Sequence, residues 1–235
     1  MNHSLPPSAR ALASALVACC LAGTAHANLL TNGSFDQGTF TGGSFGFPLA
    51  QQLNPGDTTM PGWSVVSAEI AWFKSGQAGI ATQDGQYALD LTGFCDLGLA
   101  CGSPGVYGGV TQTVATLVGG TYHLGFYAGS YAFNGVQPTL TATVDGSTQN
   151  FLLDSTNQTA GAWTALGLDF VATSASTSIT FGGVGGLRGS TFYLGLDNVS
   201  LDLTSAPTAV PEPGTYALML AGLAGVGFVA RRRRA

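Results

Sequence analysis

Apolar and polar residues alternate with a period of two through residues 121–127, where Tyr122, Leu124 and Phe126 share one face of an extended strand. Runs with the same alternation or with high β propensity occupy about 63–73, 86–92, 107–114, 139–144, 147–153, 166–170, 176–182 and 191–203. The pattern predicts eight or nine strands, and it shows no helical period between residues 28 and 205.

Turn residues and composition support this interpretation. Each run is bounded by Gly, Pro, Asn or Asp, and Asp145-Gly146 is a strong hairpin signal. Glycine accounts for 35 of the 235 residues, while only 8% of residues are charged, which disfavours helices. We therefore expect one all-β domain over residues 28–205, an antiparallel β-sandwich of the jelly-roll kind.

The first 27 residues have the order of a secretory signal peptide. One positive charge at Arg10 precedes an apolar run over 11–22, and the small-residue triplet 25–27 predicts cleavage before Asn28. The apolar run is too short for a stable membrane-spanning helix. Residues 16–19 also match a lipobox, so cleavage at Cys19 is the alternative.

The other end combines three features in a fixed order. A motif of Pro211, Glu212 and Pro213 closes a linker over 206–213, and an apolar stretch over 214–230 follows it. Seventeen residues at about 1.5 Å each give about 25 Å, the lower limit for a spanning helix. The basic end at 231–235 carries Arg231, Arg232, Arg233 and Arg234, which should stay cytoplasmic. The pattern predicts one C-terminal transmembrane helix.

These three features together resemble the PEP-CTERM sorting signal. The resemblance implies that a membrane protease of the exosortase type processes the tail and releases the protein or transfers it to the cell surface. A simple C-terminal tail anchor is the alternative, and it predicts the same topology. Either way the expected location is the cell envelope.

Charge and cysteine content fit an exported domain. Of 12 acidic and 7 basic residues, removing Glu212, Arg10 and the four terminal arginines leaves 11 and 2, a net charge of −9. Such a domain repels phosphate backbones, so we expect no nucleic-acid partner. Cys95 and Cys101 lie six positions apart in a Gly-rich segment, and the oxidising exterior predicts a disulfide between them.

The ends of the expected domain resemble the opening and closing strands of galactose-binding-like jelly rolls, which include many carbohydrate-binding modules. The resemblance rests on residues 28–36 and 196–201, with Pro61-Gly62-Trp63 and Trp163 in fitting places. It implies that Asp36 and Asp197 help to hold a structural calcium ion.

The strand pattern gives Asp197 independent interest. Its parity places it on the same face as Val199 and Leu201, where a carboxylate is costly unless it is paired, hydrogen-bonded or coordinated. Oxygen ligands suit calcium better than zinc. The alternative is that Asp197 lies at the beginning of the strand, partly solvated or capping a loop.

Aromatic residues are the candidates for ligand contact, because aromatic rings stack on the apolar faces of sugars. The candidate ligand-binding residues are Trp72, Tyr107, His123, Tyr127 and Tyr131. The alternative is that these side chains belong to the core of the sandwich.

Catalysis is not expected. Residues 42–46 match Gly-x-Ser-x-Gly, but no helix is expected after them, as a nucleophile elbow would require. Glu69 is the only glutamate before the sorting motif, and no carboxylate pair stands out.

The sequence thus predicts a structural or adhesive surface protein, with a carbohydrate-binding module as the alternative. Ice binding is a remote third, because it requires repeated threonine rows. Thr139, Thr141 and Thr143 line one strand, but no ladder of such rows is apparent in the sequence.

Overall fold

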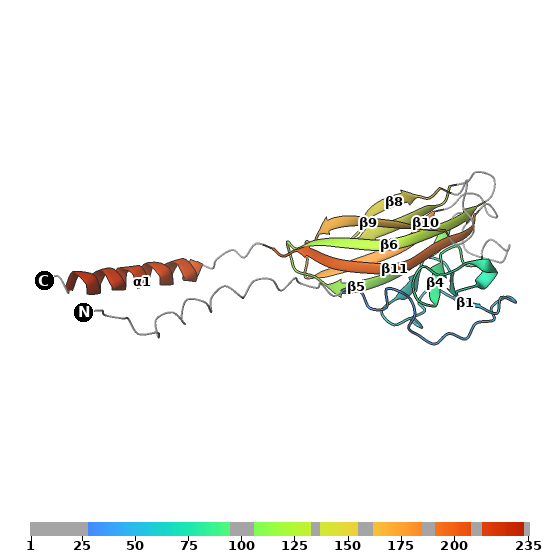
Figure 1. Ribbon diagram of the computed structural model, residues 1–235, viewed down its shortest axis with the longest axis horizontal. Helices are drawn as coiled ribbons and strands as arrows, with labels where there is room; N and C mark the ends of the chain where they lie inside the picture. The colour runs from blue at the N-terminus through green and yellow to red at the C-terminus, as the bar shows by residue number, and fades with distance from the viewer. Residues whose placement is uncertain are drawn as a thin grey trace, which may run out of the picture.

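Two antiparallel sheets stack into a β-sandwich in the computed structural model, which describes residues 28–94, 106–132, 137–154, 162–184, 191–207 and 213–232 (Figure 1). The six-stranded sheet has the order β1 (Ala50–Leu53), β3 (Ile70–Lys74), β4 (Tyr87–Asp90), β11 (Thr191–Ser205), β6 (Thr121–Ala132) and β9 (Trp163–Val171). The five-stranded sheet has the order β2 (Ser64–Val66), β5 (Val106–Ala115), β10 (Ser176–Val184), β7 (Thr139–Val144) and β8 (Ser147–Leu152). The predicted all-β sandwich is confirmed.

The strands differ from the sequence prediction in two places. The run predicted over 63–73 is two strands, β2 and β3, which belong to different sheets. Ser67 between them has a φ of 69°, so the chain turns there and crosses from one sheet to the other. The alternation of apolar and polar residues did not predict β1, whose four residues include two glutamines.

The core lies between the sheets and is rich in aromatic side chains. Phe126 of β6 and Phe181 of β10 meet across it with ring centroids 4.9 Å apart. Two fully buried indoles bind the segment before β1: Trp63 donates its ring N–H to the Asn32 carbonyl at 2.9 Å, and Trp72 donates to the Phe35 carbonyl at 3.0 Å. The N-terminal segment is therefore an integral part of the domain.

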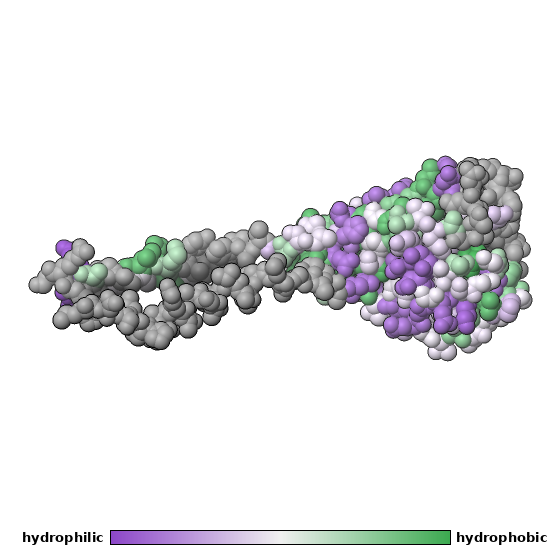
Figure 2. Space-filling model, viewed as in Figure 1, coloured by the Kyte–Doolittle hydropathy of each residue, from purple (hydrophilic) through white to green (hydrophobic). Residues whose placement is uncertain are grey.

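The C-terminal segment forms α1 (Pro213–Arg232), which Figure 1 shows apart from the sandwich. Large apolar side chains on its surface are exposed, among them Leu218 and Phe228, and Figure 2 shows apolar residues along it. Within the described ranges, no helix is both long enough and apolar enough to cross a membrane. The predicted helix is thus present, and the predicted membrane span is not confirmed.

Candidate functional site

Three of the predicted ligand-binding residues lie on the outer face of β6. The neighbours of this strand in the six-stranded sheet are β11 and β9, and its buried positions alternate with His123, Tyr127 and Tyr131. These three residues are four positions apart, so successive ones are separated by about 13 Å along the strand. His123 is exposed, and the two tyrosines are half-buried.

Tyr127 stands among small residues. Its partner on β9 is Ala165, which is exposed, and Gly125 and Gly129 precede and follow it on the same face of β6. Gly167, the β9 partner of Gly125, continues the row of small residues. These small residues form a shallow floor on the β9 side of Tyr127, whereas its partner on β11 is Asp197, which the loop over 75–86 covers.

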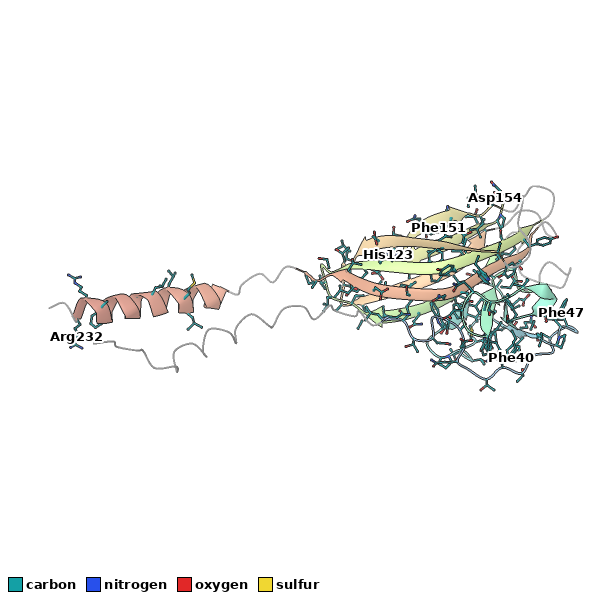
Figure 3. All side chains as sticks on the ribbon, in the orientation of Figure 1. Phe40, Phe47, His123, Phe151, Asp154 and Arg232 are labelled. Carbon is teal, nitrogen blue, oxygen red and sulfur yellow. The ribbon has the colours of Figure 1, made fainter. Side chains whose placement is uncertain are left out.

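The His123 ring lies over one end of this floor, next to Gly125 and Gly167. Its Nδ1 atom lies 2.6 Å from Oδ1 of Asp169 on β9, and both side chains are well exposed, with 46% and 70% of their surface accessible. Figure 3 labels His123 on the sandwich. Gly167 makes this pose possible, since a Cβ atom there would lie 2.9 Å from Cε1 of His123. The imidazole and the carboxylate place hydrogen-bonding groups beside the small residues.

Trp163 bounds the other end, and sequence reasoning did not select it as a ligand residue. Its ring packs edge-on against Tyr193 with centroids 6.0 Å apart, and its Nε1–H donates to the Ala81 carbonyl at 2.9 Å. Tyr193 is buried between Trp163 and Phe73, and burial raises the pKa of its phenol well above 10. The loop over 75–86 therefore covers this end of the sheet.

Asp197 lies on the outer face, and its predicted position in the core is wrong. Asn198 has a φ of 47°, and the pairing of β11 with β6 shifts between Asp197 and Ser200. This bulge reverses the parity of the strand, so Leu196 and Val199 both face the core while Asp197 faces away from it. Asp197 is nevertheless fully buried, because the loop over 75–86 lies on it.

Backbone N–H groups surround the Asp197 carboxylate. Oδ2 accepts from Gln83 N at 2.8 Å and Asp84 N at 3.0 Å, while Oδ1 accepts from Asn198 N at 2.7 Å. Burial raises the pKa of this carboxyl from its ordinary value of 3.8 to about 7, although these hydrogen bonds act in the opposite direction. Asn198 also donates its amide to Gln83 Oε1 at 2.8 Å, a second attachment of the loop.

Asp36 binds the same loop further along. Its Oδ1 accepts from Gln86 N at 2.7 Å and Tyr87 N at 3.0 Å. The two aspartates that resemblance paired as calcium ligands are thus brought to one loop, but they hold it by N–H donors. No group of three or more acidic, histidine or cysteine side chains that would hold a metal ion occurs in the described part of the chain. Both carboxylates accept hydrogen bonds from backbone N–H groups, and the structural calcium ion that the resemblance implies stays a prediction.

Trp72 and Tyr107 do not belong to the candidate site. Trp72 is fully buried against Phe40 and Tyr87, with centroids 5.3 and 5.2 Å away, and its one N–H is bound to the chain. Tyr107 is 9% exposed and belongs to the main core cluster. Both are core residues, so the alternative interpretation of aromatic side chains in a sandwich applies to them.

Two further sequence predictions concern the cysteine pair and the Gly-x-Ser-x-Gly segment. Cys95 and Cys101 lie outside the described residues, so their disulfide stays a prediction. In the Gly-x-Ser-x-Gly segment, Ser44 forms an isolated bridge with Phe47, and its Oγ accepts from Gln52 N at 2.9 Å. No helix follows this segment, which is instead a turn leading into β1.

A cleft of about 560 Å³ opens at the edge of the sandwich, between β8 and β9. Its walls combine amides and hydroxyls of β8 with apolar side chains of β9, for example Gln149, Asn150, Leu168 and Phe170. None of the predicted site residues lines it.

Two sequence families match the chain. The profile described as "Protein of unknown function (DUF642)" matches residues 28–201, and the PEP-CTERM protein-sorting motif matches residues 209–234. Among curated proteins, none matches this chain.

Several solved structures match this chain at low sequence identity. The carbohydrate-binding module TmCBM61, solved with beta-1,4-galactotriose, is 19% identical, and the match covers 75% of this chain and 99% of that one with a TM-score of 0.43. The structure of "a putative sugar binding protein from Bacteroides thetaiotaomicron" is 16% identical over 76% of this chain and 100% of that one, with a TM-score of 0.43. The arabinofuranosidase MgGH51 is 17% identical, with a TM-score of 0.46, over 75% of this chain but only 26% of the enzyme.

Proposed function

Because this chain belongs to the family described as "Protein of unknown function (DUF642)" and ends in a PEP-CTERM sorting motif, we propose that it is an exported cell-envelope protein whose sandwich binds extracellular polysaccharide without catalysis. The sorting motif indicates export and sorting to the cell envelope. Binding to polysaccharide then provides the adhesive role that the sequence predicts.

The observation that carries the binding proposal is the setting of Tyr127. Tyr127 is half-buried between Asp197 of β11 and the exposed Ala165 of β9, and its β9 side is bounded by Trp163 at one end and the His123–Asp169 pair at the other. An aromatic ring supplies flat apolar contact, and the imidazole and carboxylate supply hydrogen bonds. A sugar chain combines apolar ring faces with hydroxyl groups, so it complements both features. We name the surface formed by His123, Gly125, Tyr127, Ala165 and Asp169 the tyrosine platform.

The charge of the domain restricts the polysaccharide. With 11 acidic and 2 basic residues between 28 and 205, the domain carries a net charge of −9 and repels acidic polymers. The proposal is therefore a neutral polysaccharide. The tail supports delivery to its site of action: we propose that an exosortase-type protease recognises Pro211, Glu212 and Pro213, and that the exposed apolar surface of α1 holds the chain at the membrane before processing.

A glycan array tests the binding proposal. The purified exported protein is applied to neutral glycans, and the dissociation constant for the best one is compared with that of the Tyr127→Ala variant. Loss of ring contact worth about 1 kcal/mol raises the dissociation constant roughly fivefold to tenfold.

The matched control is Leu117→Ala, which removes an apolar side chain that is 52% exposed in the turn between β5 and β6. This variant should bind as the unmodified protein does. If Tyr127→Ala binds every neutral glycan with unchanged affinity, the tyrosine platform is not the binding site.

A further inference from the structure

A row of hydroxyl residues crosses the entire five-stranded sheet. Strand register places Ser64 opposite Thr111, Thr111 opposite Thr180, Thr180 opposite Thr143, and Thr143 opposite Thr148, one residue from each strand. No ladder of repeated threonine rows was expected, and the register shows this single row. Alternation within each strand is visible in the sequence, but the register that aligns the five strands is not.

Hydrogen bonds between side chains join two of the four neighbouring pairs in this row. Oγ1 of Thr111 lies 2.8 Å from Oγ1 of Thr180, and Oγ1 of Thr143 lies 2.8 Å from Oγ1 of Thr148. Each hydroxyl has one donor and two acceptor positions, so capacity remains for a ligand. Adjacent strands are about 4.8 Å apart, and the five residues therefore span about 19 Å in a regular array.

The other strand positions on this face are uncharged, and Asp145 in the turn between β7 and β8 lies at its edge, where it accepts from Ser178 N at 2.8 Å. The outward positions of this face that are at least partly exposed are Ser64, Val66, Thr111, Thr113, Ala115, Thr139, Thr141, Thr143, Thr148, Asn150, Leu152, Ser176, Ser178, Thr180 and Gly182. Not one of these side chains is charged or aromatic, although the domain carries a net charge of −9. We name this surface the hydroxyl face.

We propose that the hydroxyl face is a second binding surface, which binds the flat surface of a packed, uncharged polysaccharide. This inference rests on the proposed function and adds a second, chemically different site to it. The regular array of hydroxyls donates and accepts hydrogen bonds along a plane, as the hydroxyls of a packed neutral polymer do. A single soluble sugar chain fits the tyrosine platform better, because the hydroxyl face has no ring to stack on it.

Other occupants fit the hydroxyl face less well. A polyanion is repelled by the net charge of the domain. A second copy of the chain brings the same net charge, and a stable interface between copies has an apolar core, often aromatic, that this face lacks.

The position of the hydroxyl face adds a mechanical role. The tyrosine platform lies on the outer face of the six-stranded sheet and the hydroxyl face on the outer face of the other sheet, so they point to opposite sides of the sandwich. One molecule can then bind a loose chain on one side and a packed surface on the other. Such a molecule links two polymers, as an adhesive matrix protein must.

Adsorption of the exported protein to insoluble probes tests the proposal. The probes are microcrystalline cellulose and an insoluble neutral β-glucan, with an alginate gel as the acidic comparison. The Thr143→Val/Thr180→Val variant removes two hydroxyls from the row but keeps their β-branched shape, and circular dichroism checks its fold. We expect the variant to adsorb at least threefold less than the unmodified protein, while its binding of soluble glycan is unchanged.

Thr148→Glu is the second variant, chosen because the residue is exposed on an edge strand. It should also lose adsorption to both neutral probes. Equal adsorption of both variants and the unmodified protein would overturn the inference. So would dimerisation through this face in solution, or inhibition of ice growth that these variants lose.

The two proposals fail in different ways. If Tyr127→Ala no longer binds soluble glycan, but Thr143→Val/Thr180→Val and Thr148→Glu adsorb to the insoluble probes as the unmodified protein does, this inference is wrong and the proposed function stands. If the unmodified protein binds neither soluble nor packed neutral glycan, the proposed function itself is wrong.

Discussion

The buried Asp197 predicts how the stability of the domain depends on pH. Burial raises the pKa of its carboxyl from 3.8 to about 7 in the folded protein. Between these two values the unfolded chain loses the proton while the folded protein keeps it, so the free energy of unfolding falls as pH rises. A shift of about three units corresponds to roughly 4 kcal/mol, lost between about pH 4 and pH 7. This contribution of Asp197 to the free energy of unfolding is fully present only below about pH 4.

The Asp197→Asn variant isolates this effect. The amide does not titrate, so the variant lacks the decline of about 1.4 kcal/mol per pH unit that the aspartate contributes. Asparagine also places an N–H₂ group against one of the three N–H donors, which costs about 1 kcal/mol at every pH. Burial raises the pKa of Glu69 as well, and for this reason the quantity to compare is the difference between the two proteins.

Urea unfolding followed by the fluorescence of the buried Trp63 and Trp72 measures this difference at pH 4, 5, 6, 7 and 8. Asn198→Gly is the matched control, since it removes the amide bond to Gln83 and accepts the φ of 47° without titrating. The control should keep the pH dependence of the unmodified protein. If Asp197→Asn also keeps it, the three N–H donors outweigh burial and the reasoning is refuted.

Three further predictions concern other parts of the chain. Gly33→Ala should lower the melting temperature by roughly 10 °C, because its Cβ would lie 1.9 Å from the carbonyl oxygen of Val199; an unchanged transition in calorimetry would contradict this. Mass spectrometry of the unreduced exported protein should find Cys95 linked to Cys101, a bond worth about 2 kcal/mol for so short a loop, whereas two free thiols would rule it out. Deletion of 209–235 should move the protein from the cell envelope into the medium, as measured by fractionation, and retention at the envelope would disprove sorting by the tail.

Alternation predicted most of the strands because each residue faces either the core or the exterior. It failed where the backbone departs from the simple period. At Asn198 a left-handed residue inserts a bulge, and the predicted face of Asp197 is reversed. Ser67 likewise divides one predicted strand into two that enter different sheets. Both departures depend on single φ values that hydrophobic pattern does not encode.

The candidate site was predictable in part. The parity of β6 already places His123, Tyr127 and Tyr131 on one face, and the glycines between them are visible in the sequence. Trp72 lies at a similar aromatic position but in the core, because the neighbouring strands and the N-terminal segment close over it. Which aromatic side chains stay accessible depends on these long-range contacts, and so does the alignment of the hydroxyl face.

The histidine on the tyrosine platform offers the most direct test of the central claim. His123 is the only histidine after residue 27, so the Hε1 proton of its ring gives one NMR signal in the processed protein, assigned by its loss in His123→Asn. We predict that the neutral glycan selected on the array shifts this signal in a saturable way, with the same dissociation constant as the array measures. A glycan that binds the protein while the His123 signal stays in place would contradict the account.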